Sequence, residues 1–166
     1  MQYPQLAKFN IIVNIATQQL VVLQGKSPTH KYHISSARLG TGNQQNSYKT
    51  PLGKHIIRAK IGANCPVNSV FVERRLTGEC FNENLYQKYP NRDWILTRIL
   101  WLSGTEVGYN RLGNVDSMRR YIYIHGTPDQ YPLGIPQSQG CIRMHNKDIV
   151  ELFNLVPINT KVEIVK

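Results

Sequence analysis

His125 and Cys141 are the two residues of this chain whose types and spacing best suit nucleophilic chemistry. His125 ends an apolar stretch and is followed by Gly126, whereas Cys141 comes later in the same region, directly after Gly140. A histidine can take the proton of a nearby thiol and hold the thiolate as an ion pair. A glycine before the cysteine lets successive backbone N–H groups point towards one spot, as in an oxyanion hole. The pattern predicts a cysteine nucleophile with a histidine base.

Each of these residues also has a simpler interpretation, which the sequence leaves open. Cysteine is often a buried structural thiol, and a histidine at a strand end is often satisfied by the backbone. Arg143 could bind a substrate carboxylate, or it could form a salt bridge at the edge of the core. Cys141, His125 and His145 could suggest zinc, but no Cys-x-x-Cys or His-x-x-x-His spacing is present. We therefore expect no metal and no cofactor.

The composition indicates one folded domain with an anionic partner. The 166 residues are 41% hydrophobic and 18% charged, which suits a single globular domain over residues 1–166. No apolar run approaches the ~20 residues of a membrane-spanning helix, so we expect no membrane span. The net charge of +10 favours nucleic acid, acidic lipid or a substrate with several carboxylates. Because basic residues do not interleave with aromatic ones as on an RNA-binding sheet, we expect no nucleic-acid partner.

The apolar residues alternate more often than they follow a helical period, which predicts a mainly β fold. We expect strands over residues 9–15, 20–23, 32–36, 55–61, 70–75, 95–102, 121–125 and 161–165, the first two as a hairpin. A helix is predicted over residues 146–153, with Asn146 as its N-cap and Pro157 limiting its extension. The polar segment 80–93 fits either a short helix or an irregular insertion.

The cysteines and the first residues bear on the cellular compartment. Three cysteines without close pairs argue against a disulfide framework, although a bridge between Cys65 and Cys80 stays open in an oxidising compartment. The first eight residues lack the apolar core of a secretory signal. If Met1 is the native start, we expect a cytoplasmic protein. A periplasmic protein is the alternative, if an export signal was removed or lies outside this sequence.

Residues 121–144 read YIYIHGTPDQYPLGIPQSQGCIRM, and this segment resembles the signature of the L,D-transpeptidase (YkuD-type) family. That signature has His-Gly, a spacer of similar length, then Ser or Thr, His, Gly, Cys, a hydrophobic residue and Arg or Asn. Three further stretches resemble the family in the same order: residues 11–23, residues 50–53, and the helix and strand after Cys141. The resemblance covers nearly the whole chain.

The resemblance implies a β-sandwich-like catalytic domain with one or two short helices, no metal, and a cysteine acyl-enzyme mechanism. The family acts on the peptide stems of peptidoglycan. It attacks the carbonyl of the third residue, usually meso-diaminopimelate, and expels the fourth, D-Ala. By position in the signature, Cys141 is the nucleophile and His125 the base, and the backbone carbonyl of Gly126 orients the histidine.

The resemblance also implies the remaining site residues. The N–H groups of Gly140 and Cys141, with that of Gln139 as a further candidate, would form the oxyanion hole. Ser138 and Arg143 are the candidate substrate-binding residues. One position departs from the family, because Gln139 stands where a histidine is usual and glutamine carries no proton at neutral pH. Since the family's base position is still a histidine, we expect activity.

The acyl acceptor decides which reaction follows. In this family water, a diaminopimelate amine, a lipoprotein lysine or a free D-amino acid can resolve the thioester. For a cytoplasmic protein we expect soluble tetrapeptide fragments or precursors as substrates and water as acceptor, which gives an L,D-carboxypeptidase of peptidoglycan recycling. The alternatives are a periplasmic L,D-transpeptidase that forms 3–3 cross-links, and a non-catalytic peptidoglycan- or nucleic-acid-binding module. A carbapenem, which acylates this family's cysteine, is the expected covalent inhibitor.

Overall fold

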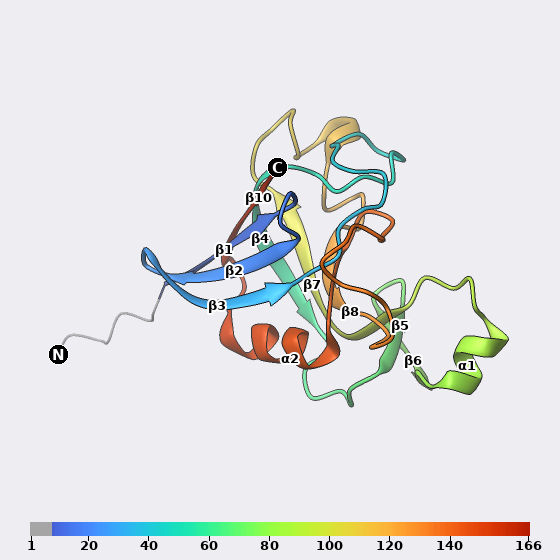
Figure 1. The fold of residues 1–166 in the computed structure, drawn as a ribbon. Helices are drawn as coiled ribbons and strands as arrows, with labels where there is room; N and C mark the ends of the chain where they lie inside the picture. The colour runs from blue at the N-terminus through green and yellow to red at the C-terminus, as the bar shows by residue number, and fades with distance from the viewer. Residues whose placement is uncertain (1–7) are drawn as a thin grey trace.

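The computed structural model describes residues 8–166, which form one mixed β-sheet and two α-helices (Figure 1). The strands are β1 (Phe9–Asn14), β2 (Gln19–Gln24), β3 (Ser27–His33), β4 (Gly53–Ile61), β5 (Ser69–Val72), β6 (Arg75–Cys80), β7 (Ile95–Gly104), β8 (Tyr123–Gly126), β9 (Ile142–Met144) and β10 (Lys161–Val165). The helices are α1 (Glu83–Lys88) and α2 (Asn146–Leu155), with a 3-10 turn at Gly113–Val115. The predicted mainly β fold with short helices is confirmed.

Hydrogen bonding links most strands in the order β3-β2-β1-β10-β4-β7-β5-β6. β1 and β2 form the predicted antiparallel hairpin, and β10 pairs with β1 in parallel. β8 lies off this path, because it pairs with β7 on one side and with the short strand β9 on the other. The last pair is parallel, so the chain between β8 and β9 must cross over before it returns to the sheet.

The main core lies between the sheet and α2. The first hairpin buries every second residue, as expected for strands with one face against a core. α2 packs against β7 and β8, and its buried face carries Ile149, Leu152 and Phe153. Burying each of these side chains stabilises the fold by about 1.5–3 kcal/mol. The helix therefore fixes the strand that carries His125.

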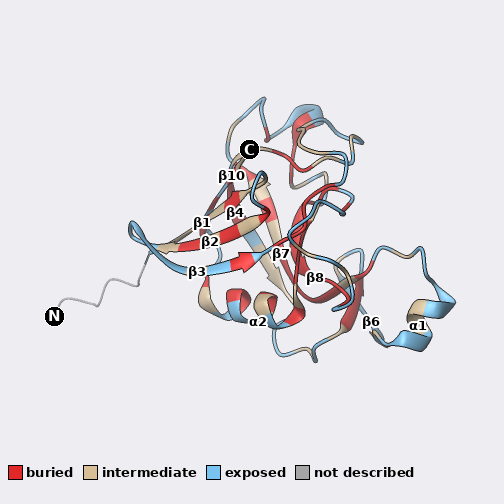
Figure 2. Ribbon diagram, viewed as in Figure 1, coloured by how far each residue is buried: buried red, intermediate tan, exposed pale blue. Residues whose placement is uncertain are grey.

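Several local predictions were wrong or incomplete. The N-cap of α2 is His145, and Asn146 is the buried first residue of the helix. The strand expected over residues 70–75 ends at Val72, and β6 and β9 were not predicted. The undecided polar segment contains α1, which buries none of its residues and projects away from the sheet (Figure 2). The expectation about the first eight residues concerns, apart from Lys8, residues outside the described range.

Neither helix within residues 8–166 combines the length and the apolar character that crossing a membrane requires.

Candidate active site

β8 and β9 bring the two predicted catalytic residues to one wall of the fold. The strands pair in parallel with His125 opposite Arg143, and Cys141 stands directly before β9. Cys141 therefore lies beside Tyr123, and Tyr123 precedes His125 by two positions in β8. Because β8 is also hydrogen-bonded to β7, the histidine sits on a strand that is paired on both sides.

His125 is buried, with only 1% of its surface exposed, and its ring is oriented by the backbone. Nδ1 lies 2.6 Å from the carbonyl oxygen of Gly126. A carbonyl oxygen only accepts hydrogen bonds, so Nδ1 must carry the proton of the neutral ring. Nε2 is then left with its lone pair, which is the form that a general base needs. The structure thus has the Gly126 contact that the sequence analysis expected.

The backbone at Gly126 passes very close to Leu96 and Asn146. A Cβ atom on Gly126 would lie 2.5 Å from Asn146 Oδ1 and 2.6 Å from the backbone oxygen of Leu96. The hydroxyl of Thr97 donates to Asn146 Oδ1 at 2.5 Å, and Thr97 has a φ of 73° at an irregularity in β7. Positive φ is costly for a β-branched residue, and such strain gathers at functional sites. Only glycine fits at this point behind His125.

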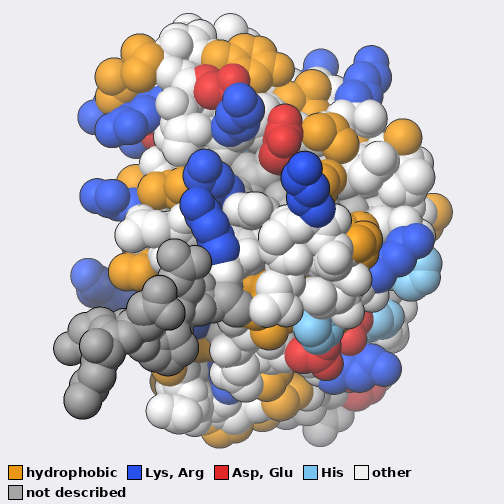
Figure 3. All heavy atoms as spheres, turned by 90° about the vertical axis from the view of Figure 1, so that its left-hand side faces the viewer, with side chains coloured by type: hydrophobic (Ala, Val, Ile, Leu, Met, Phe, Trp, Pro, Cys, Tyr) orange, Lys and Arg blue, Asp and Glu red, His pale blue; other side chains and the backbone are white. Residues whose placement is uncertain are grey.

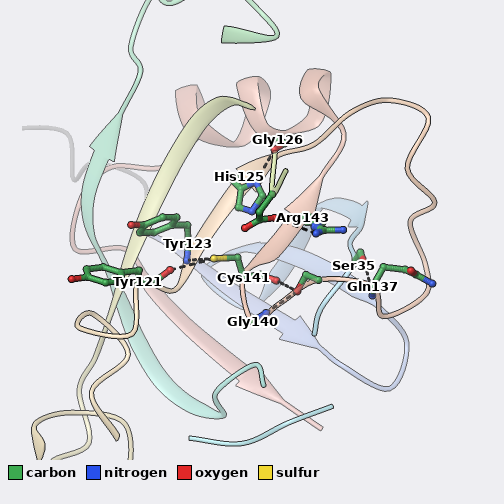
Figure 4. Close-up of polar contacts among 11 residues, drawn as sticks. Ser35, Tyr121, Tyr123, His125, Gly126, Gln137, Gly140, Cys141 and Arg143 are labelled. Carbon is green, nitrogen blue, oxygen red and sulfur yellow. Dashed lines mark hydrogen bonds and ion pairs between the residues drawn. The ribbon is translucent and has the colours of Figure 1, made fainter. Parts of the chain in front are cut away.

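The Cys141 sulfur is hydrogen-bonded to backbone groups of β8 and of the turn before it (Figure 4). The N–H of Tyr123 donates to Sγ at 3.3 Å, and the thiol donates to the carbonyl oxygen of Tyr121 at 3.2 Å. Among residues 8–166, no hydrogen bond joins Sγ to His125. The ion pair expected from the sequence is therefore not formed in this arrangement. His125 can take the thiol proton only when Sγ comes within hydrogen-bond distance of Nε2.

The turn before the cysteine is held by two hydroxyl groups. The Ser138 hydroxyl donates to the Cys141 carbonyl at 2.5 Å and accepts from the Gly140 N–H at 3.2 Å. The Thr50 hydroxyl donates to the Gly140 carbonyl at 2.9 Å. Gly140 has a φ of 134°, a backbone conformation that residues other than glycine rarely adopt. The turn is thus fixed from both sides.

These contacts bear on the predicted oxyanion hole and substrate contacts. The Gly140 N–H and the Ser138 hydroxyl are engaged within the turn, so neither is free for substrate in this arrangement. The N–H groups of Gln139 and Cys141 donate to no acceptor within residues 8–166. They remain the available donors for a developing oxyanion. Gln139 is exposed and lines the cavity over the cysteine.

Arg143 forms a salt bridge, which is the second of the two roles that the sequence left open for it. Its Nη2 lies 3.4 Å from Asp93 Oδ1, and its Cζ lies 5.5 Å from the centre of the Tyr131 ring. The guanidinium also lines the cavity, so this position does not exclude a substrate contact. Sequence reasoning missed Asp93, which stands outside every motif and reaches the site only because β7 pairs with β8.

The surroundings of His125 favour its neutral form. Burial lowers the pKa of the imidazole below its ordinary value, and the Arg143 guanidinium adds to this effect. The Asp93 carboxylate and the Gly126 carbonyl oppose it, because both stabilise the imidazolium. The histidine is therefore neutral, and able to accept a proton, at pH 7.

The surroundings of Cys141 favour the thiol. Burial raises the pKa of Cys141 to about 12. The hydrogen bond from the Tyr123 N–H opposes this rise, as do the guanidinium groups of Arg143 and Arg120, whereas the Asp93 carboxylate adds to it. The resting site thus holds a neutral thiol beside a neutral imidazole. This arrangement therefore does not favour the thiolate.

A cavity of about 520 Å³ opens over these residues and has a cationic lining. Arg74, Arg120 and Arg143 contribute to it, with Glu73 and Asp93 as the carboxylates. On the face seen in Figure 3, Lys and Arg lie in several separate places among polar and hydrophobic side chains. The positive lining of the cavity therefore suits a small anionic ligand better than an extended polyanion.

The sequence left open a disulfide and considered a metal site, and the described residues form neither. Cys65, Cys80 and Cys141 are all free thiols, so the bridge left open between the first two is not formed. Within residues 8–166, no group of three or more His, Cys, Asp and Glu side chains is placed to hold a metal ion.

Comparison with known proteins gives a match over almost the whole chain. Residues 8–164 match the YkuD family model, which describes the L,D-transpeptidase catalytic domain. YkuD of Bacillus subtilis (strain 168) is 48% identical over 46 residues, which cover 28% of this chain and 28% of that protein. ErfK/SrfK of Escherichia coli (strain K12) is also 48% identical over 46 residues, or 28% of this chain and 15% of that protein.

Solved structures share the fold at low sequence identity. L,D-transpeptidase 3 from Mycobacterium tuberculosis, in complex with a faropenem-derived adduct, aligns with a TM-score of 0.59 and 16% identity over 96% of this chain and 61% of that chain. An L,D-transpeptidase in complex with imipenem aligns with a TM-score of 0.56 and 15% identity over 96% of this chain and 59% of that chain. This chain thus spans about three fifths of the length of these two structures.

Proposed function

Because this chain belongs to the L,D-transpeptidase (YkuD) catalytic domain family, we propose that it acts on the peptide stem of peptidoglycan through a thioester on Cys141. The observation that carries the proposal is the pairing of β8 with β9. It places Cys141 and a backbone-oriented His125 in one cationic cavity. A stem peptide bears several carboxylates, which suits that lining.

Acylation begins when the Cys141 sulfur turns from the Tyr121 carbonyl towards His125. Nε2 takes the thiol proton as Sγ attacks the carbonyl carbon of the diaminopimelate residue. The N–H groups of Gln139 and Cys141, which donate to no other acceptor within residues 8–166, then donate to the oxyanion. The imidazolium then returns its proton to the amine of the departing D-Ala. The thioester remains on the enzyme.

For the second half-reaction we favour water as acceptor, which makes the protein an L,D-carboxypeptidase that converts tetrapeptide to tripeptide. Three arginines line the cavity, and one of its two carboxylates is already paired with Arg143. This lining disfavours an incoming ammonium group, whereas water meets no such penalty. His125 deprotonates the water, which adds to the thioester and releases the tripeptide and the free thiol. The alternative is transfer to a diaminopimelate amine, which the name of the matched family favours.

The test is incubation with a disaccharide-tetrapeptide, followed by mass spectrometry of the products. We expect tripeptide and free D-Ala from the wild type and from Cys80→Ala, whose exposed thiol lies outside the cavity. Cys141→Ala should release nothing. A 3–3 cross-linked dimer as the main product would show that transpeptidation is the true activity. Unchanged substrate would contradict both proposals and support a binding module.

A further inference from the structure

The hairpin of β5 and β6 brings one of the three cavity arginines, Arg74, to the site. Val72 pairs with Arg75, so Glu73 and Arg74 form the two-residue turn between the strands. Both turn residues have positive φ, 48° for Glu73 and 66° for Arg74, as this tight type of turn requires. Neither is the glycine or asparagine that such turns favour. The turn places the Arg74 side chain in the lining of the cavity.

The Arg74 guanidinium is held in a fixed orientation by aromatic side chains. Its Nη1 donates to the hydroxyl of Tyr123 at 2.8 Å. Its Cζ lies 4.7 Å from the ring centres of both Trp101 and Tyr121. Stacking of this kind orients the planar group while leaving the donors on its free edge exposed.

This cradle is built from the residues that hold the nucleophile. The backbone of Tyr123 donates to Cys141 Sγ, and the backbone of Tyr121 accepts from it. The side chains of the same two tyrosines hold Arg74. In Figure 4 both tyrosines lie on one side of Cys141, with His125 and Arg143 on the other. Arg74 therefore lines the same cavity as Cys141 and is held by the two tyrosines whose backbone groups contact the sulfur.

The three arginines of the cavity differ in what satisfies their charge. Arg143 is paired with Asp93 at 3.4 Å. Arg120 donates to three oxygen atoms of residues 42–49, at 2.6 to 3.1 Å. Within residues 8–166, Arg74 has no carboxylate within salt-bridge distance, and its hydrogen bond goes to a neutral phenol. A guanidinium has five N–H donors, so most of those of Arg74 remain free.

We propose that Arg74 binds a carboxylate of the acyl-donor peptide in the cavity that contains Cys141; this inference rests on the stem-peptide substrate of the proposed function. Arg74 combines a fixed position, free donors and a charge without a salt-bridge partner among residues 8–166, and it lines the cavity that contains Cys141. A planar fork of this kind matches the two oxygen atoms of a carboxylate. Among the carboxylates of the tetrapeptide, we assign Arg74 to one of the two nearest the bond that is cut, the terminal D-Ala carboxylate or the free carboxylate of diaminopimelate.

Binding to the Cys141→Ala variant tests the inference without any turnover. Calorimetry would compare that variant with versions that also carry Arg74→Gln, Arg74→Lys or Arg75→Gln. Arg75 is the matched control, because it adjoins Arg74 but does not line the cavity. The probes are the disaccharide-tetrapeptide and two analogues, one amidated at the D-Ala carboxylate and one at the diaminopimelate carboxylate.

We expect Arg74→Gln to weaken binding of the unmodified peptide by about ten- to a hundredfold, the usual range for a charge-assisted hydrogen bond. Arg74→Lys should recover part of this loss, and Arg75→Gln should leave the affinity unchanged. One of the two amidated peptides should bind weakly from the start and lose nothing further with Arg74→Gln. That peptide identifies the carboxylate.

Three results would overturn the inference. Equal weakening of all three peptides by Arg74→Gln would show that the side chain only supports the shape of the cavity. An unchanged affinity for the unmodified peptide would show no contact, and so would the absence of binding by every peptide at millimolar concentration. Arg74-dependent binding together with a wild type that releases no D-Ala would instead uphold the inference and contradict the proposed reaction.

Discussion

The two sides of Cys141 are built in different ways. On one side His125 lies on a doubly paired strand, is buried, and is oriented by a backbone carbonyl at a point where only glycine fits. On the other side Arg74 is partly exposed at the tip of a hairpin and is held by one hydrogen bond and two aromatic rings. In the proposed mechanism, proton transfer therefore depends on a residue fixed in the core, whereas the proposed substrate contact depends on a residue at a partly exposed hairpin tip.

The largest loss of activity is expected on the His125 side, when the base itself is removed. His125→Ala should lower the rate of D-Ala release by about a hundred- to ten-thousandfold, the range for general acid–base catalysis. Gln139→His is the matched control, since it adds a histidine to the exposed wall and should leave the enzyme active. Steady-state kinetics checks both variants. If His125→Ala kept most of the rate, the assignment of the base would be wrong.

Gly126→Ala should be the next most damaging change, although it adds a single methyl group. The new Cβ would collide with Asn146 Oδ1 and with the Leu96 carbonyl, and the second of these is backbone that cannot rotate away. The Gly126 carbonyl must then move away from His125, and we expect a loss of about a hundredfold in kcat. Thermal unfolding should still show one cooperative transition. A kcat within twofold of the wild type would contradict the positioning role of this carbonyl.

The sequence reveals the His125 side better than the Arg74 side for a physical reason. His125, Gly126 and Cys141 stand in a short segment whose spacing is set by the chemistry, so the pattern is visible along the chain. Asp93 and Arg74 reach the cavity only through the pairing of β7 with its neighbours, and no local pattern records that pairing.

The same limit explains the wrong N-cap and the missing strands. Asparagine is a residue type favoured at N-caps, but the Asn146 side chain forms hydrogen bonds with the Thr127 carbonyl and the hydroxyl of Thr97 instead. β9 has only three residues, too few to show an alternation, and is defined by pairing with β8 and with Ser35. In both cases tertiary contacts override a local preference.

Asp93 belongs to the His125 side, where it pairs with Arg143, and its removal should have a moderate effect on the pH profile. The Asp93 carboxylate raises the pKa of His125, so Asp93→Asn should lower that pKa. The base must be neutral to act, and the rate falls as the pH drops through its pKa. The acid limb of D-Ala release should therefore move to lower pH, by less than about one unit, because the Asp93 side chain is 42% exposed and solvent screens it. A shift of the acid limb to higher pH would contradict this account.

The smallest effect is expected at the hairpin tip. Glu73 has a φ of 48°, which asparagine tolerates better than glutamate does. Glu73→Asn should raise the free energy of unfolding by about 0.5 kcal/mol or less and leave the kcat for D-Ala release within twofold. Thermal unfolding and kinetics on the same preparation check both statements. A large loss of kcat would show that the hairpin contributes to the chemistry, against the comparison drawn above.

The central claim is that Cys141 is the acylated nucleophile, and the mass of the intact protein after exposure to a carbapenem tests it most directly. Wild type and Cys80→Ala should each gain the mass of one carbapenem, whereas Cys141→Ala should gain none. His125→Ala should react more slowly, because its thiol has no base to activate it. Equal labelling of the wild type and Cys141→Ala would contradict the claim and place the reactive group elsewhere in the chain.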